Sequence, residues 1–170
     1  MKSRCRVAIE GALPRALGLT RGALAAAARY FAARSAARSG HLFREVTVVL
    51  QNDGFSAETH LAINGTEGPT DVITQPYDAM PGEPDGVYGE LYVNCEQALR
   101  AAPKRAGWSA AKELLLYVAH GMDHLSGADD LEPRDYARMR RRELGWLGDY
   151  EREASRRESG AAGGGERSGR

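Results

Sequence analysis

The chain alternates between hydrophobic patterns of two periods, one typical of strands and the other of helices. Alternating or β-branched runs predict short strands at residues 4–10, 45–50, 69–76 and 87–93. Three-to-four-residue spacing and capping residues predict helices at residues 20–39, 56–63, 95–105, 110–125 and 133–147. We therefore expect a single compact α+β domain, with a small mixed β-sheet packed against about five helices.

The strongest helical signal lies over Ala110–Leu125, with Ser109 as its N-cap and Gly127 after its end. The stretch 114–119 within it is apolar on nearly every side. A helix that is apolar all round is buried, so we expect this one at the centre of the domain.

The folded domain is predicted to span residues 1–150. A length of 170 residues is typical of one domain. Beyond Tyr150 the sequence is rich in Gly, Glu, Arg and Ser and has no apolar period. We therefore expect residues 151–170 to be a disordered polar tail.

The composition bears on the compartment in which we expect the protein. No apolar run approaches the ~18 residues that a membrane span requires. The basic start of the chain leads into an apolar stretch that Glu10 and Pro14 interrupt, which is unlike a secretory signal. Two cysteines, Cys5 and Cys95, cannot make a disulfide framework. We therefore expect a cytoplasmic, monomeric protein that has reduced thiols and no membrane partner.

Charge is balanced overall and strongly segregated along the chain. There are 23 basic and 23 acidic residues, yet residues 45–99 hold ten acids and neither Lys nor Arg. Residues 1–44 hold nine basic groups against Glu10 alone. Such blocks can gather a polyanion on one face, or they can neutralise each other across the fold. The pattern alone does not establish nucleic-acid binding.

Two histidines on the central helix form the strongest chemical signal. An i,i+4 separation places His120 and His124 on one helix face, close enough to bind one metal ion. After the turn at Gly127, Asp129 and Asp130 return carboxylates toward the same place. Two histidines and a carboxylate leave a zinc position open to water, which is typical of a catalytic site. A hydrogen-bonded core pair beside ordinary turn aspartates is the simpler alternative.

The pattern does not match a zinc peptidase. Those enzymes carry His-Glu-x-x-His, in which the glutamate is the general base. Gly121 occupies that position here, and Asp123 lies at the wrong offset to replace it. Peptide hydrolysis is therefore disfavoured.

The run from His120 to Asp130, His-Gly-x-x-His-Leu-x-Gly-x-Asp-Asp, resembles the signature of the YbeY family of bacterial rRNA maturation factors. Pro69–Ile73 and Gly89–Val93 resemble two upstream strands of that family. The resemblance implies a metal-dependent endoribonuclease with one Zn²⁺ per chain. It assigns the metal-ligand and catalytic roles to His120, His124 and Asp130, and leaves Asp129 to orient a ligand or accept a proton.

Two departures from the family pattern affect these expectations. Asp130 stands where the family has a third histidine, and its charge should make the metal a weaker Lewis acid. Asn64 stands near the position of an arginine thought to serve the phosphate. Another basic group must then contact RNA. The candidates for RNA contact are Arg29, Arg34, Arg38 and Asn64.

The resemblance implies a single-strand-specific endoribonuclease that acts in 16S rRNA 3′-end maturation and ribosome quality control, with a zinc-bound water. Its expected partners are rRNA in the small ribosomal subunit and a ribosomal protein or assembly GTPase. Two alternatives remain open. One is a non-catalytic, zinc-containing ribosome-assembly factor, and the other is a metal hydrolase of another substrate.

Overall fold

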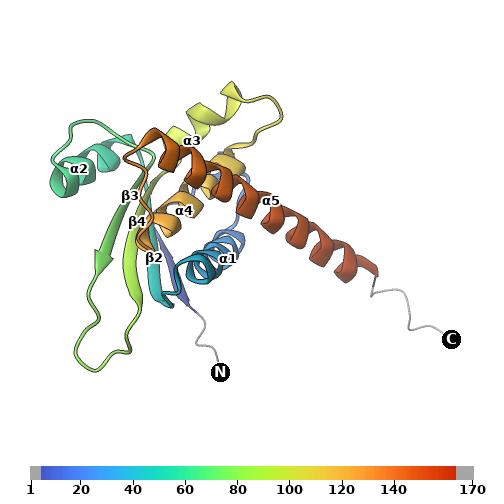
Figure 1. Ribbon diagram of the computed structural model, residues 1–170. Helices are drawn as coiled ribbons and strands as arrows, with labels where there is room; N and C mark the ends of the chain where they lie inside the picture. The colour runs from blue at the N-terminus through green and yellow to red at the C-terminus, as the bar shows by residue number, and fades with distance from the viewer. Residues whose placement is uncertain (1–4, 164–170) are drawn as a thin grey trace.

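A computed structural model describes the backbone of residues 5–163 (Figure 1). It describes the side chains of residues 5–160. Four strands form one mixed sheet in the order β1-β2-β4-β3. They are β1 (Arg6–Glu10), β2 (Phe43–Gln51), β3 (Val72–Tyr77) and β4 (Val87–Asn94). Strands β1, β2 and β4 are parallel, whereas β3 pairs antiparallel with β4 at the edge. Pro76 within β3 suits this edge position, because proline has no N–H to donate to a second neighbouring strand.

Five α-helices and two short 3-10 helices complete the described part of the chain. The helices are α1 (Arg21–Ser39), α2 (Asp53–Asn64), α3 (Cys95–Ala101), α4 (Ala110–Leu125) and α5 (Pro133–Gly163), with η1 (Arg15–Leu17) and η2 (Ala102–Lys104). The predicted α+β architecture with a small mixed sheet is confirmed. No helix among residues 5–163 is long and apolar enough to cross a membrane.

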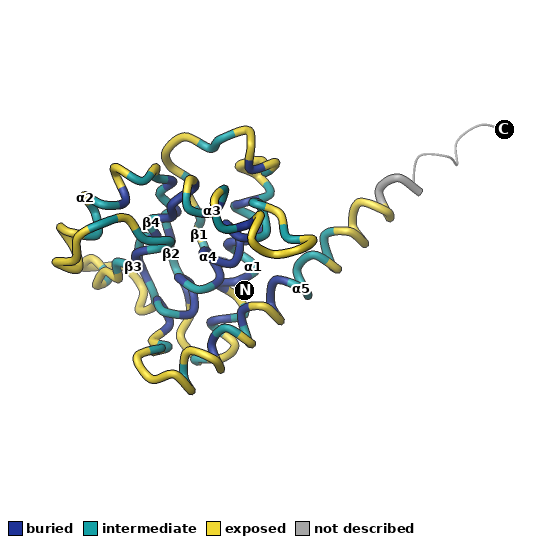
Figure 2. Tube along the Cα trace, turned by 90° about the horizontal axis from the view of Figure 1, so that it is seen from above, coloured by how far each residue is buried: buried dark blue, intermediate teal, exposed yellow. Residues whose placement is uncertain are grey.

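The domain is layered around α4. Helix α1 packs on β1 and β2, and α4 lies beside it on β3 and β4 (Figure 1). Helix α5 crosses α4 on the side away from the sheet. Figure 2 shows the buried residues gathered where these layers meet. Leu114, Leu116 and Val118 are almost fully buried, so α4 is the central helix that its apolar run predicts.

Helix α2 starts earlier than the sequence predicts. Its N-cap is Asn52, whose side chain accepts a hydrogen bond from the Phe55 N–H at 2.9 Å. Ser56, the predicted cap, lies buried inside the helix instead. Its hydroxyl donates to the Thr70 carbonyl and accepts from the Thr70 N–H, both at 3.1 Å. The predicted cap thus joins α2 to the segment that leads into β3.

Helix α5 also ends later than predicted. The sequence predicts helix to Leu147 and disorder from residue 151, but the helix continues to Gly163. The Tyr150 ring packs against Tyr30 of α1, with ring centroids 5.4 Å apart. One turn further on, the Glu153 carboxylate lies 3.9 Å from the Arg34 guanidinium. These contacts with α1 stabilise the distal part of α5, and the hydrophobic pattern of the sequence gives no sign of them. Residues 164–170 of the expected tail lie outside the described residues.

Candidate metal centre

Helix α4 brings the two histidines of the predicted site together. One helical turn separates His120 and His124, and their Nε2 atoms lie 3.1 Å apart. Both side chains are largely buried, at 12% and 26% exposed. The pair therefore faces a sheltered space near the carboxyl end of the helix.

The turn after α4 returns a carboxylate to this pair. Gly127 adopts a backbone φ of +88°, which side-chain-bearing residues rarely occupy. The chain then brings Asp130 back, with Oδ2 3.6 Å from the His120 Nε2 and 3.5 Å from the His124 Nε2. One donor atom from each of the three residues lies within 4.8 Å of the other two. The second aspartate of the turn, rather than the first, completes this cluster.

The spacing of these three donor atoms fits a tetrahedral metal ion. Donors about 2.0–2.2 Å from a zinc ion lie roughly 3.3–3.6 Å from one another in a tetrahedron. The two separations from Asp130, 3.5 and 3.6 Å, lie within that range, and the 3.1 Å between the two Nε2 atoms lies just below it. Three protein donors also leave one corner of the tetrahedron open to another ligand.

Hydrogen bonds hold both imidazoles in the form a metal needs. The Nδ1 atom of His124 lies 3.0 Å from the Ala128 carbonyl, which can only accept. The Nδ1 atom of His120 lies 2.7 Å from Oε1 of Glu143 on α5. When each Nδ1 donates, each Nε2 presents its lone pair toward Asp130. Partners of this kind fix ring orientation and tautomer in metal sites.

Glu143 is a functional candidate that the sequence analysis missed. Its side chain is fully buried, and Oε2 lies 3.6 Å from Nη1 of Arg140. Burial alone would lower the pKa of His120, but the bond to the Glu143 carboxylate and its charge raise that pKa above its usual value. The only sequence signal for Glu143 is its four-residue spacing from the buried Met139 on an arginine-rich helix.

Arg140 is a second residue near the centre that the sequence analysis does not single out. Its guanidinium lies over the Tyr136 ring, 5.6 Å from the ring centroid, and its side chain is 21% exposed. Its charge acts on both His120 and Asp71. The described centre therefore has a cation on its α5 side.

Gly121, which stands where a zinc peptidase has its glutamate, lies where α4 packs closely on the sheet. A side-chain carbon at this position would lie 2.7 Å from Cδ2 of Leu91 and 3.2 Å from Cγ2 of Val72. Helix α4 packs closely on β3 and β4 here, so a side chain after His120 would require Leu91 and Val72 to shift.

The remaining aspartates near the centre serve the backbone and the core. Asp129 accepts a hydrogen bond from the Leu131 N–H at 3.1 Å and so braces the turn that carries Asp130. Asp123 is fully buried, 2.8 Å from Nε of Arg38 and 2.9 Å from Nε of Arg142. This carboxylate ties α4 to both α1 and α5.

The candidates for RNA contact do not gather at one place. Arg34 lies 3.7 Å from Asp149, and Arg38 is occupied by Asp123 and Ser126. Arg29 lines a hollow between α1 and the distal half of α5. Asn64 ends α2 and is exposed. Their contact with RNA stays a prediction.

The sequence of this chain is similar to known proteins of one family. The family model described as Endoribonuclease YbeY matches residues 16–151. A protein named Endoribonuclease YbeY from Clavibacter michiganensis is 34% identical over 105 residues, covering 58% of this chain and 68% of that protein. One of the same name from Kineococcus radiotolerans is 36% identical over 118 residues, covering 63% and 67%.

A solved structure supports the same fold. The solution structure of TM1509 from Thermotoga maritima aligns with a TM-score of 0.53 at 22% identity, covering 98% of this chain and 99% of that one.

Proposed function

This chain belongs to the YbeY family of endoribonucleases, and from that membership we propose that it hydrolyses RNA phosphodiester bonds at His120, His124 and Asp130. One observation carries the proposal. Three donor atoms from α4 and the following turn are spaced for a single tetrahedral ion with an open corner.

We propose zinc as the ion, one per chain. Two imidazoles and a carboxylate are a ligand set that zinc accepts in catalytic sites. A bound divalent ion of this kind supplies a Lewis acid and makes a water molecule more acidic.

The chain's own residues would then set the environment of the reaction. Glu143 holds His120 through Nδ1, and the Ala128 carbonyl holds His124 in the same way. The Asp130 carboxylate adds a negative charge that a third imidazole would not bring. Asp129 keeps Asp130 in place through its bond to the Leu131 N–H. Arg140 offsets the charge of the buried Glu143.

Family membership supports the cellular part of the proposal. The substrate is single-stranded rRNA at the 3′ end of 16S rRNA, and the work is maturation and ribosome quality control in the cytoplasm. The partners are the small ribosomal subunit and a ribosomal protein or assembly GTPase. The protein acts as a monomer.

One observation favours a second candidate function. Residues 45–99 contain neither Lys nor Arg, and Asn64 stands near the position of the family's arginine. The chain therefore lacks, at about that position of its sequence, the cation with which the family is thought to meet phosphate. A zinc-containing assembly factor that does not cleave RNA, or a hydrolase of another substrate, would accommodate this loss.

A cleavage assay separates these functions. The purified protein is incubated with end-labelled 16S rRNA fragments, with and without zinc, beside the His120→Ala/His124→Ala variant. We expect zinc-dependent cleavage that the double variant lacks. Bound zinc at one ion per chain without cleavage would favour the assembly factor. Cleavage that survives the double change would refute the proposed site.

A further inference from the structure

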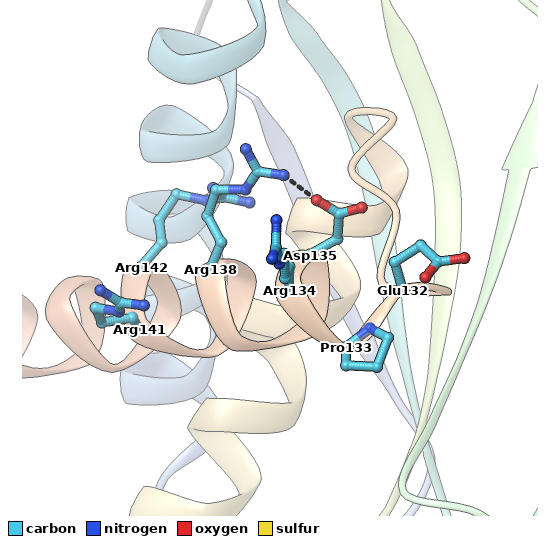
Figure 3. A pocket seen from close by; sticks show the side chains of 7 residues that line it. All are labelled: Glu132, Pro133, Arg134, Asp135, Arg138, Arg141 and Arg142. Carbon is cyan, nitrogen blue, oxygen red and sulfur yellow. Dashed lines mark hydrogen bonds and ion pairs between the residues drawn. The ribbon is translucent and has the colours of Figure 1, made fainter.

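A second feature lies on the outer side of α5, where its first turns border a broad hollow of about 1150 Å³. Four arginines line it, from α5 alone: Arg134, Arg138, Arg141 and Arg142 (Figure 3). Only two acids, Glu132 and Asp135, line the same hollow. We call Arg134, Arg138 and Arg141 the arginine face.

The helical repeat explains why these three side chains act together. Residues four and three positions apart lie on one side of a helix, so Arg134, Arg138 and Arg141 form one stripe. All three residues are exposed. This side of α5 is opposite the one that buries Met139 and Glu143 against the domain.

Two of these four arginines have no partner within the described residues. Arg142 is bonded to the buried Asp123, and Arg138 pairs with Asp135. Within residues 5–160, the side chains of Arg134 and Arg141 make no hydrogen bond or ion pair. Their guanidinium groups are free to meet an outside anion. Guanidinium groups suit phosphate because they can donate two parallel hydrogen bonds.

The arginine face begins close to the candidate metal centre. Only Leu131 and Glu132 lie between Asp130 and Pro133, the first residue of α5, and three steps along the chain span at most about 11 Å. Residues 45–99, which include the strands β3 and β4 beneath α4, hold neither Lys nor Arg. An extended polyanion at the metal centre would therefore find its compensating charge along the start of α5.

We propose that the arginine face binds the phosphate backbone of the RNA strand whose scissile bond lies at the metal centre. This inference rests on the proposed function, and it assigns backbone contact to residues outside the set that sequence reasoning selects. Backbone contacts position a strand without reading its sequence. The affinity of the arginine face for RNA should accordingly depend on the length of the strand and not on its base sequence.

The test is a charge-neutralising variant with a matched control on the same helix. Arg134→Gln/Arg138→Gln/Arg141→Gln is compared with Arg152→Gln/Arg156→Gln/Arg157→Gln, which removes equal charge from exposed positions in the distal half of α5. Binding of fluorescein-labelled 2′-O-methyl RNA to the zinc-loaded proteins is followed by anisotropy over a series of salt concentrations. Hydrolysis of bis-p-nitrophenyl phosphate, which is too small to span the face, reports on the centre itself.

We expect RNA affinity to fall on the order of tenfold in the first triple variant, and the slope of log K against log salt to lose about 2. The control variant should keep the wild-type RNA affinity and the wild-type salt slope. Both triple variants should still hydrolyse the small phosphodiester. Arg134→Gln and Arg141→Gln, made singly, should each lower the slope by about 0.7. Because neither side chain has a structural partner, these single variants test the face even if the triple variant folds poorly.

Wild-type affinity and slope in the first triple variant would overturn the inference, as would an equal loss in the control. Loss of an acidic protein partner with RNA binding unchanged would overturn it too. If the wild-type protein hydrolyses neither RNA nor the small phosphodiester, the proposed function fails instead.

Discussion

Nδ1 of His120 lies 2.7 Å from Oε1 of Glu143, a carboxylate that α5 buries completely. The bond joins the proposed metal ligand to a helix that begins only after the histidine motif has ended. Its effect should appear in metal affinity, because the ligand's orientation and basicity both depend on this partner.

Replacing this carboxylate is the first prediction. Glu143→Gln should weaken zinc binding by about 10–100-fold, since the amide can still contact Nδ1 but carries no charge. Competition with a chromophoric chelator measures the change. Glu158→Gln, an exposed exchange on the same helix, should leave affinity unchanged. Equal affinities in wild type and Glu143→Gln would show that the bond does not tune the site.

The same pair makes the stability of the metal-free protein depend on pH. Because the pKa of His120 is raised in the folded state, its contribution is complete below the unfolded value of about 6.5. That contribution is lost as pH rises through the higher folded value. Urea unfolding of metal-free protein should therefore show a decline across this range that is smaller in Glu143→Gln. A decline of the same size in both proteins would contradict the assignment.

Asp130 gives a prediction about the pH profile of catalysis. A carboxylate ligand makes the metal a weaker Lewis acid than an imidazole would, and the water it activates is less acidic. Asp130→His should keep one zinc per chain and shift the rising limb of the pH–rate profile to lower pH. Asp130→Ala should lose stoichiometric zinc, as measured by elemental analysis. Full zinc retention in Asp130→Ala would remove Asp130 from the ligand set.

The buried carboxylate of Asp123 gives a prediction about stability. It lies between Arg38 and Arg142, and removing one partner of a buried ion pair costs about 3–5 kcal/mol. Asp123→Ala should lower the free energy of unfolding by about 3 kcal/mol, near the low end because both arginines are partly exposed. Urea denaturation measures this. Arg38→Met should cost less, since Arg142 still compensates the carboxylate. The reverse order would argue against the three-residue cluster.

Thiol chemistry gives the last prediction. Burial raises the pKa of Cys5 and that of Cys95 to about 11, so few thiolates exist at neutral pH. Iodoacetamide should modify native protein far more slowly than urea-unfolded protein at the same pH. Rapid native modification of Cys95, which is 2% exposed, would mean that α3 opens readily.

Local patterns were enough to predict most of the fold. The limits of α4 follow from Ser109 and the apolar run, and α1 ends at Gly40 as expected. The edge position of β3 agrees with Pro76, which has no N–H to give to a second neighbouring strand. The start of α2 was wrong because Asn52 and Ser56 are both good caps, and only the contact of Ser56 with Thr70 decides between them. The end of α5 depends on contacts with α1, which no local pattern contains.

The candidate site likewise has a part that local sequence patterns predict and a part that they do not. His120, His124 and the returning aspartate belong to one short segment, so their spacing and the family resemblance together point to the cluster. Glu143 and Arg140 reach it from a separate helix, and the angle at which α5 crosses α4 is a tertiary property. The bonds from Arg38 and Arg142 to Asp123 are hidden for the same reason, because their basic patterns resemble solvated helix faces.

The bare backbone at Gly121 limits what this scaffold could become. Since α4 packs closely on the sheet there, an exchange to glutamate would require the Leu91 and Val72 side chains to repack before the new carboxylate could stand beside His120. Any group introduced next to His120 is therefore coupled to the packing of the sheet beneath α4.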